Sequence, residues 1–323
     1  MEFCSQVKNA YSRIKTLKAQ GAENVALEAV AALSGQAQAS KAKTSGGLVA
    51  ELEKTAAFLA SSRPTEPAMR NELSAIAGEA RKNKKLAVGA LKQMLSTSAG
   101  YYPPRIAKAR EKISAYGAKL VPNGGRVFVH CHSTSVMAVL KRAWRDGKRF
   151  KVFCNESRPL FQGHISAKEL SACGMPVTMI VDDAALFFLK QSAGKAGGGT
   201  KTVFFVGADA VTSRGELVNK IGSSMMAIAA REAGAKFYSC TLLHKYDSKT
   251  EGGKQEPIEF RDGNELLACA AKDEIGALSR VNIANPAFDA TPPQFVTAYV
   301  TEAGVLAPKK AVEVARKMFR GRF

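Results

Sequence analysis

The sequence predicts an α/β protein: a helical N-terminal domain over residues 1–121, followed by a doubly wound parallel-sheet domain over residues 122–323. Two observations support this fold class. Apolar residues first recur at helical spacing within an alanine-rich composition. Beyond residue 122, short apolar runs alternate with amphipathic stretches, a pattern typical of strands joined by helical crossovers.

The N-terminal domain is expected to contain helices only. Helical periodicity is clearest over residues 25–33 and 48–59, and the linker to the second domain is predicted as a helix over residues 105–120. Pro103 and Pro104 fit the first turn of that helix. Because glycine and proline interrupt helices, breaks are expected at Gly46 with Gly47, at residues 63–67 and at residues 96–104.

The C-terminal domain is expected to be Rossmann-like. The predicted strands are residues 126–131, 150–155, 177–181, 203–206 and 236–241. The predicted helices between them are residues 134–145, 167–173, 184–191 and 223–234. This alternation indicates a parallel sheet with right-handed crossovers.

Hydropathy and cysteine usage narrow the class of protein. The most apolar stretch, residues 176–189, contains Asp182 and Asp183, so no membrane span is expected. The N-terminus shows no basic start followed by an apolar run, so a cytoplasmic protein without a secretory signal is expected. The six cysteines form no Cys-x-x-Cys pair, which is typical of reduced thiols rather than of a disulfide framework.

The chain is strongly basic, with 47 Lys+Arg against 28 Asp+Glu and a formal net charge of +19. The excess is divided about evenly between residues 1–119 and 120–323, and only residues 81–85 and 316–322 form dense basic runs. Nucleic-acid binders usually gather their charge on one face and interleave aromatic residues. Solvated helix faces therefore explain these runs better than a nucleic-acid site, and a field that attracts a small polyanionic substrate is a further interpretation.

Polar clusters follow four of the predicted strands, where a doubly wound sheet binds its ligands. The clusters are residues 130–133, residues 155–159, Asp182 with Asp183, and residues 207–209. Because the carboxyl ends of parallel strands meet at one edge of the sheet, we expect an active site there.

Cys131 lies between two histidines, directly before a helix opened by Ser133 and Thr134. Free amides at a helix N-terminus favour an anion, so a lowered thiol pKa and a role as base or nucleophile form one interpretation. An inert buried thiol is the other. Zinc would also suit a His-Cys-His run, but strand alternation points the histidines away from the cysteine and no second ligand pair follows, so no metal site is predicted.

Asp209 follows the fourth predicted strand, and Gly207 would let the backbone approach a ligand closely. A turn or capping aspartate is the alternative interpretation. Asn219 and Lys220 come shortly before a helix opened by Ser223, where amides and an ammonium group suit a phosphate.

Two nucleotide-binding motifs are not supported. Residues 194–201 contain glycines, a threonine and lysines, but the order is threonine then lysine and the segment runs from a helix into a strand. It is predicted to be a flexible surface loop. No Gly-x-Gly-x-x-Gly follows the first strand, so no dinucleotide is expected and no cofactor is predicted.

Taken together, these clusters resemble the signature of one superfamily. The segments are residues 129–133 (VHCHS), 155–163 (NESRPLFQG), 207–212 (GADAVT), 218–222 (VNKIG) and 285–293 (NPAFDATPP). The superfamily contains the alpha, beta and delta subunits of translation initiation factor 2B, methylthioribose-1-phosphate isomerase and the archaeal ribose-1,5-bisphosphate isomerases. The likeness covers the C-terminal domain and, more weakly, the helical N-terminal domain.

Within that superfamily the chain most resembles ribose-1,5-bisphosphate isomerase, through His-Cys-His-Ser and residues 166–170 and 285–293. The resemblance implies conversion of ribose 1,5-bisphosphate to ribulose 1,5-bisphosphate in AMP salvage, with Cys131 as proton acceptor and Asp209 as proton donor. It implies a homo-oligomer, a dimer or a hexamer built from dimers. It places substrate contacts at Gln20, Gly21, Ala22, Glu23, Arg63, Ser133, Thr134, Ser135, Asn219, Lys220 and Lys245.

Two departures from the family pattern leave alternatives open. The family's Arg-Gly-Ala-Gly motif begins with Gln20 and ends with Glu23 here, and the lysine after His-Cys-His-Ser is Thr134. A phosphate facing Glu23 would meet repulsion of about 1 kcal/mol or more. The alternatives are methylthioribose-1-phosphate isomerase, which handles a monophosphate, and a non-catalytic regulatory subunit like those of the initiation factor. Retention of Cys131 and Asp209 favours catalysis, because moving a carbonyl from C1 to C2 needs a base and an acid.

Overall fold

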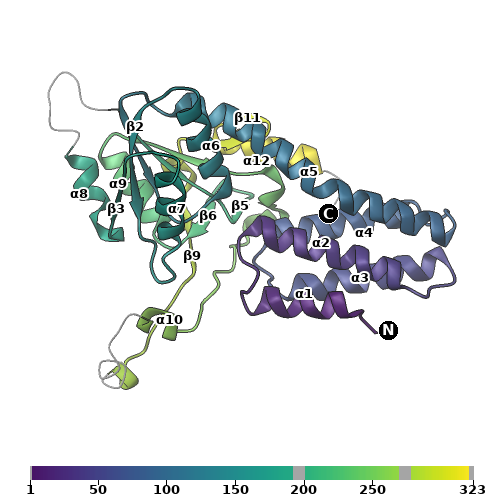
Figure 1. Cartoon of the computed structure of the whole chain (residues 1–323). Coiled ribbons are helices and arrows are strands. Elements are labelled where there is room, and N and C mark those ends of the chain that lie inside the picture. Colours follow the sequence, from purple (N-terminus) through teal and green to yellow (C-terminus); the bar gives the residue numbers. More distant parts are fainter. Residues whose placement is uncertain (1, 192–200, 269–277, 320–323) are drawn as a thin grey trace. The chain divides into compact units, whose positions relative to one another are not determined.

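A computed structural model describes residues 2–191, 201–268 and 278–319 (Figure 1). Residues 194–200 of the predicted loop, residues 320–322 of the C-terminal basic run and Cys269 lie outside the described residues. The described chain forms two compact units. The first comprises residues 2–109, 243–248 and 313–319, and the second comprises residues 110–242 and 249–312 without the gaps named above. The domain boundary between residues 121 and 122 stays a prediction.

The first unit is built from helices, as the periodicity predicts. They are α1 (Ser5–Lys15), α2 (Ala22–Ala39), α3 (Ser45–Ser61), α4 (Pro67–Lys82) and the first part of α5 (Val88–Leu120). Each of α2, α3 and α4 buries one apolar face, and Leu33, Leu52 and Leu73 are at most 1% exposed. None of the helices in the described residues is long and apolar enough to cross a membrane.

Two of the three predicted helix breaks are wrong. Gly46 and Gly47 lie inside the first turn of α3, because Thr44 caps that helix and accepts a hydrogen bond from the Gly47 amide at 3.1 Å. Pro103 and Pro104 lie inside α5, which continues through them with two amide donors missing. The break at residues 63–67 is confirmed, since α3 ends at Ser61 and Pro67 opens α4.

The second unit contains a seven-stranded sheet, and the predicted α/β fold is confirmed. Its strand order is β11-β10-β7-β4-β1-β2-β3, with β11 antiparallel and the other pairs parallel. The strands are β1 (Gly125–Val129), β2 (Phe150–Asn155), β3 (Val177–Ile180), β4 (Thr202–Val206), β7 (Lys236–Cys240), β10 (Ala298–Thr301) and β11 (Gly304–Leu306). From β3 to β10 this is the doubly wound order of a Rossmann-like fold.

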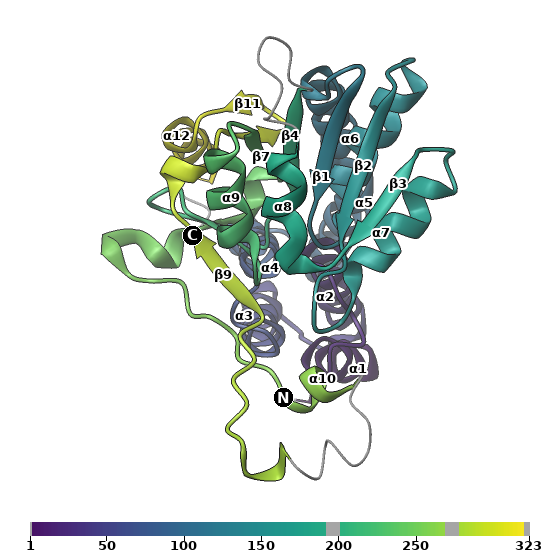
Figure 2. The same cartoon turned by 90° about the vertical axis from the view of Figure 1, so that its left-hand side faces the viewer.

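Helices cover both faces of the sheet, with α6 and α7 on one face and α8 and α9 on the other (Figure 2). They are α6 (Thr134–Arg145), α7 (Gln162–Ser171), α8 (Ala185–Lys190) and α9 (Ser223–Glu232), and the chain closes with α12 (Pro308–Phe319). The core between them is aromatic: Phe128 stacks on Phe153 with ring centroids 4.7 Å apart and on Phe204 at 5.8 Å. Burying these rings fixes the position of β1, and so of the residues that follow it.

The strands β10 and β11 of the main sheet were not predicted, and neither were three short strands beside it. The three short strands are β5 (Ala210–Thr212), β6 (Leu217–Lys220) and β9 (Phe288–Thr291), and β6 pairs antiparallel with both of the others. A small apolar cluster that includes Ala210, Val218 and Phe288 holds them together. This antiparallel group presents Asn219 and Lys220 beside the main sheet.

Candidate active site

The candidate site lies where the strand order of the main sheet reverses. The chain runs outward from β1 to β3 on one side and from β4 to β10 on the other, so the switch point lies between β1 and β4. These two strands are paired, with Val129 opposite Phe205. Cys131 follows β1 and Asp209 follows β4, so both lie at the carboxyl edge where such sheets bind ligands.

Cys131 has an unusual backbone conformation. The strand ends at Val129, and Cys131 has φ +64°, in the left-handed region that non-glycine residues seldom adopt. Its amide donates to Ser157 Oγ at 2.7 Å, and its carbonyl accepts from Ser166 Oγ at 2.9 Å. The strand alternation predicted for residues 130–132 therefore does not hold: His130 contacts the Ile221 carbonyl and His132 contacts Ser166.

The thiol is surrounded by charged side chains at close range. Burial raises the pKa of Cys131 to about 11, Lys220 acts in the opposite direction, and Asp209 and Asp182 act with the burial. The prediction of a lowered thiol pKa is thus wrong for the unliganded protein, because desolvation outweighs the lysine. The same interactions show that Cys131, Asp209 and Lys220 converge on one place.

Asp209 is held between β4 and the antiparallel strands. Its amide donates to the Val218 carbonyl at 2.9 Å, and its side chain is half-buried. Gly207, which ends the same strand, has no room for a side chain, because a Cβ there would lie 2.9 Å from Ser133 Cβ and 3.0 Å from Ser133 Oγ. The glycine therefore lets the start of α6 approach β4.

The N-terminus of α6 supplies three of the predicted contacts. Ser133 is its N-cap, and its hydroxyl accepts from the Val136 amide at 3.4 Å. Thr134 is exposed, whereas Ser135 is buried. Unpaired amides in this first turn suit an anionic group.

Asn219 and Lys220 are the last residues of β6, and a tight turn follows them. Asn219 donates to Ser223 Oγ at 2.8 Å, and Ser223 Oγ donates to the Lys220 carbonyl at 2.7 Å. The Lys220 ammonium lies 5.1 Å from the centre of the Phe288 ring. The turn is therefore rigid, and it presents the lysine to the Cys131 side of the site.

Asp289 anchors the same turn from β9 and was not identified as a site residue in the sequence. Its carboxylate accepts from the Gly222 amide at 2.8 Å and from the Ser224 amide at 3.1 Å. Burial raises the pKa of Asp289 to about 6, even though both amides favour its charged form. In the sequence, Asp289 could be noticed only as a member of the segment 285–293. Nothing in that segment indicates that its carboxylate binds the amides at the start of α9.

The remaining predicted contacts belong to the first unit and stay predictions. They are Gln20, Gly21, Ala22, Glu23, Arg63 and Lys245. Gly21 is the N-cap of α2 with φ +81°, and Glu23 and Arg63 are buried. Arg63 forms an ion pair with Glu66, with nitrogen and oxygen 2.8 Å apart.

A buried tyrosine in the first unit was missed by sequence analysis. Tyr102 packs edge-on against His244 with ring centroids 6.4 Å apart, and Arg105 stacks over the tyrosine ring at 5.1 Å. Burial raises the pKa of Tyr102, with Glu72 and Glu23 acting in the same direction, and burial lowers the pKa of His244 to about 3, with Lys245 acting in the same direction. The unit therefore holds a buried cluster of charged and aromatic side chains. No group of three or more His, Cys, Asp or Glu in the described residues is arranged to hold a metal ion.

Comparisons with known proteins identify the family of the chain. The model of the Initiation factor 2 subunit family matches residues 18–308. Ribose 1,5-bisphosphate isomerase from Thermococcus kodakarensis is 32% identical over 322 residues, covering 99% of this chain and 96% of the relative. A 5-deoxyribose 1-phosphate isomerase from Moorella thermoacetica is 35% identical, covering 96% of this chain and 88% of the relative.

A solved structure gives the same result for the fold. 5-Methylthioribose 1-phosphate isomerase from Pyrococcus horikoshii superposes with a TM-score of 0.76 at 29% identity, covering 97% of this chain and 88% of that chain. The similarity extends over both units of the chain rather than over the sheet alone.

Proposed function

Because the chain belongs to the Initiation factor 2 subunit family, we propose that it is an aldose–ketose isomerase that converts ribose 1,5-bisphosphate to ribulose 1,5-bisphosphate. The observation that carries the proposal is the meeting of a thiol, a carboxyl group and an ammonium group, those of Cys131, Asp209 and Lys220, at the switch point of the sheet. A base and an acid on either side of a sugar carbon, with a cation nearby, are what this isomerisation requires.

The proposed chemistry conserves every atom of the substrate. Cys131, as thiolate, accepts the proton from C2 while the bond between C1 and the ring oxygen breaks, and the Asp209 carboxyl gives its proton to that oxygen. The resulting enol phosphate then takes a proton at C1 from the thiol, and the C2 hydroxyl returns a proton to the Asp209 carboxylate. Both residues finish in their starting protonation states, and no electron leaves the sugar.

The proposed partners of an anionic group of the substrate in the second unit are the start of α6, at Ser133, Thr134 and Ser135, and the Asn219–Lys220 turn. The contacts that the family resemblance predicts in the first unit are Arg63, Lys245 and the segment from Gln20 to Glu23. Arg63 and Lys245 supply the charge there, while Glu23 opposes it.

A monophosphate substrate is the second candidate, and one observation favours it: Glu23 is a buried carboxylate within the predicted contact set. The two candidates are separated by measuring kcat/KM of the purified protein on ribose 1,5-bisphosphate and on 5-deoxyribose 1-phosphate. We expect the bisphosphate to be preferred by about tenfold or more, because charge-assisted contacts to a second phosphate contribute about 1.5–3 kcal/mol. Equal or reversed preference would identify a monophosphate isomerase, and failure on both would favour the regulatory alternative.

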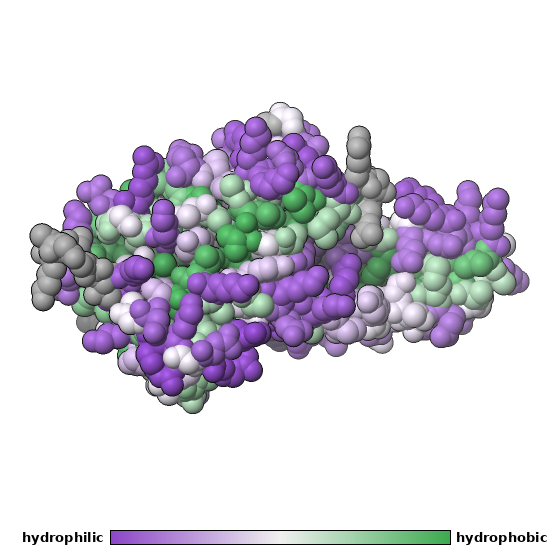
Figure 3. Space-filling model, turned by 90° about the horizontal axis from the view of Figure 1, so that it is seen from above, coloured by the Kyte–Doolittle hydropathy of each residue, from purple (hydrophilic) through white to green (hydrophobic). Residues whose placement is uncertain are grey.

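We also propose that the chain forms a homo-oligomer. Apolar side chains lie at the surface of the second unit on β3, α8 and α9, and hydrophobic areas interrupt the hydrophilic face in Figure 3. The most exposed among them are Val181, Phe187, Met179, Ile228 and Met225, at 58%, 62%, 51%, 49% and 47%. A soluble monomer seldom leaves such a set uncovered. Light scattering is expected to give a multiple of the mass of one chain, and a single-chain mass would contradict the proposal.

A further inference from the structure

The cysteine of the candidate site is held by a second residue in the same rare conformation. Ser157 has φ +64°, the same value as Cys131, and the two follow the paired strands β1 and β2. A left-handed conformation is unfavourable for a non-glycine residue, and it persists only where the surroundings fix it. Two such residues in direct hydrogen-bond contact indicate that this arrangement is kept for a purpose other than stability.

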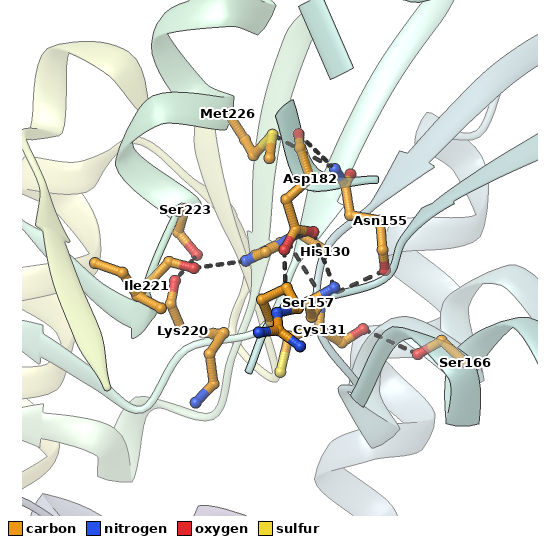
Figure 4. A network of polar contacts seen from close by, with 12 residues as sticks. His130, Cys131, Asn155, Ser157, Ser166, Asp182, Lys220, Ile221, Ser223 and Met226 are labelled. Carbon is orange, nitrogen blue, oxygen red and sulfur yellow. Dashed lines mark hydrogen bonds and ion pairs between the residues drawn. The ribbon is translucent and has the colours of Figure 1, made fainter. Parts of the chain in front are cut away.

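A chain of hydrogen bonds leads from the cysteine backbone to the turn that carries the lysine (Figure 4). The Cys131 amide donates to Ser157 Oγ at 2.7 Å, and that hydroxyl lies 3.4 Å from His130 Nδ1. On the other side of the ring, His130 Nε2 lies 2.8 Å from the Ile221 carbonyl. A carbonyl only accepts, so Nε2 carries the proton and Nδ1 is left as an acceptor facing the serine hydroxyl, which the Asn155 carbonyl also faces at 3.3 Å. Ile221 directly follows Lys220.

Further hydrogen bonds support this chain of hydrogen bonds from both sides. Asp182 accepts from the amides of Ser157 and Arg158, each at 2.8 Å, which fixes the turn after β2. Ser166 donates to the Cys131 carbonyl at 2.9 Å, which fixes the opposite side of the peptide. His130 is 2% exposed, and burial lowers its pKa, so the ring stays neutral and the direction of its hydrogen bonds is preserved at neutral pH.

We propose that Ser157 and His130 are positioning residues that hold the Cys131 thiol and the Lys220 ammonium facing each other, an inference that rests on the proposed function. Figure 4 shows the sulfur and the ammonium group pointing to the same side of the network. The charged groups that act on the thiol are Lys220, which favours the thiolate, and Asp209 and Asp182, which oppose it. Loss of the hydrogen-bond chain would let Cys131 move relative to Lys220, and the thiolate would lose its stabilising partner.

The test uses Ser157→Gly, because glycine adopts φ +64° without strain and the change removes the hydroxymethyl side chain that holds the Cys131 amide. The readout is the pH dependence of iodoacetamide alkylation at Cys131, followed by mass spectrometry of its peptide in the protein without substrate. We expect the alkylation midpoint to rise by about one pH unit, kcat to fall about tenfold to a hundredfold, and KM to change little. The unfolding midpoint in urea should stay at or above that of the wild type.

The matched control is Leu17→Gly, which relieves a left-handed residue at φ +58° in the first unit. It should leave the alkylation midpoint of Cys131 unchanged. His130→Leu should shift the alkylation midpoint in the same direction as Ser157→Gly. The double variant should shift the midpoint no further, because both substitutions interrupt the same chain of hydrogen bonds. An unchanged midpoint in Ser157→Gly, or additive shifts in the double variant, would overturn the proposal. Since alkylation needs no substrate, it gives an answer even if the proposed reaction is wrong.

Discussion

Replacing Cys131 by serine is expected to lower kcat by about a thousandfold or more while substrate still binds. A serine hydroxyl has the size of the thiol but does not ionise in the accessible pH range, so it cannot accept the C2 proton. The proposed phosphate contacts do not include the sulfur, and the dissociation constant measured by calorimetry should therefore change little.

The control for this variant is Cys173→Ser, since Cys173 is exposed and lies outside the candidate site. It should retain the activity of the wild type. Activity in Cys131→Ser within tenfold of the wild type would remove the thiol from the mechanism.

The raised pKa of the thiol predicts how its reactivity depends on pH. Burial raises the pKa of Cys131 to about 11, so only a small fraction of the protein carries the thiolate at neutral pH. Below that pKa the thiolate fraction rises tenfold per pH unit, so the rate of alkylation of Cys131 by iodoacetamide should rise with pH from neutral into the alkaline range. A rate that is already constant across this range would contradict the raised pKa.

Replacing Asp209 by asparagine is expected to lower kcat by about a hundredfold to ten thousandfold. The amide keeps the shape of the side chain and its place after β4, but it has no proton to give to the ring oxygen. Turnover and substrate binding are measured as for the cysteine variant.

A second aspartate provides the matched control. Asp183 is exposed on the turn after β3, and Asp183→Asn should leave kcat unchanged. If both aspartate variants kept full activity, the acid would have to be another group, and the assignment of Asp209 would be wrong.

The strands β1, β2, β3, β4 and β7 of the main sheet were predictable as short apolar runs, whereas β10 and β11 were not predicted. β2 was predicted with its observed bounds, and β3 and β4 within one residue. The antiparallel strands β5, β6 and β9 were missed because each is only three or four residues long. The pairing of β6 with β9 joins segments about seventy residues apart, and no local sequence pattern indicates such a pairing.

The errors in the helical unit have local causes. Pro103 and Pro104 favour a helix start, yet α5 passes through them because the turns on either side of the prolines keep the helix continuous. Gly46 and Gly47 suggest a break, but the nearby threonine cap places it a few residues earlier. In both places a neighbouring contact outweighs the preference of the residue itself.

The candidate site was predictable as a set of strand ends but not as a set of contacts. The topology rule pointed to Cys131 and Asp209, and the structure brings them together with Lys220. The left-handed backbone at Cys131, the serine that holds it and the cap formed by Asp289 depend on contacts between distant segments. The lowered thiol pKa expected from the helix N-terminus failed for the same reason, because the degree of burial is a property of the folded protein.

The most direct test of the account is to incubate the wild-type protein and Cys131→Ser side by side with ribose 1,5-bisphosphate and to follow both phosphorus resonances by NMR. The account predicts that the wild type converts the substrate to ribulose 1,5-bisphosphate and that the variant leaves it unchanged. No conversion by the wild type, or equal rates for the two proteins, would contradict it.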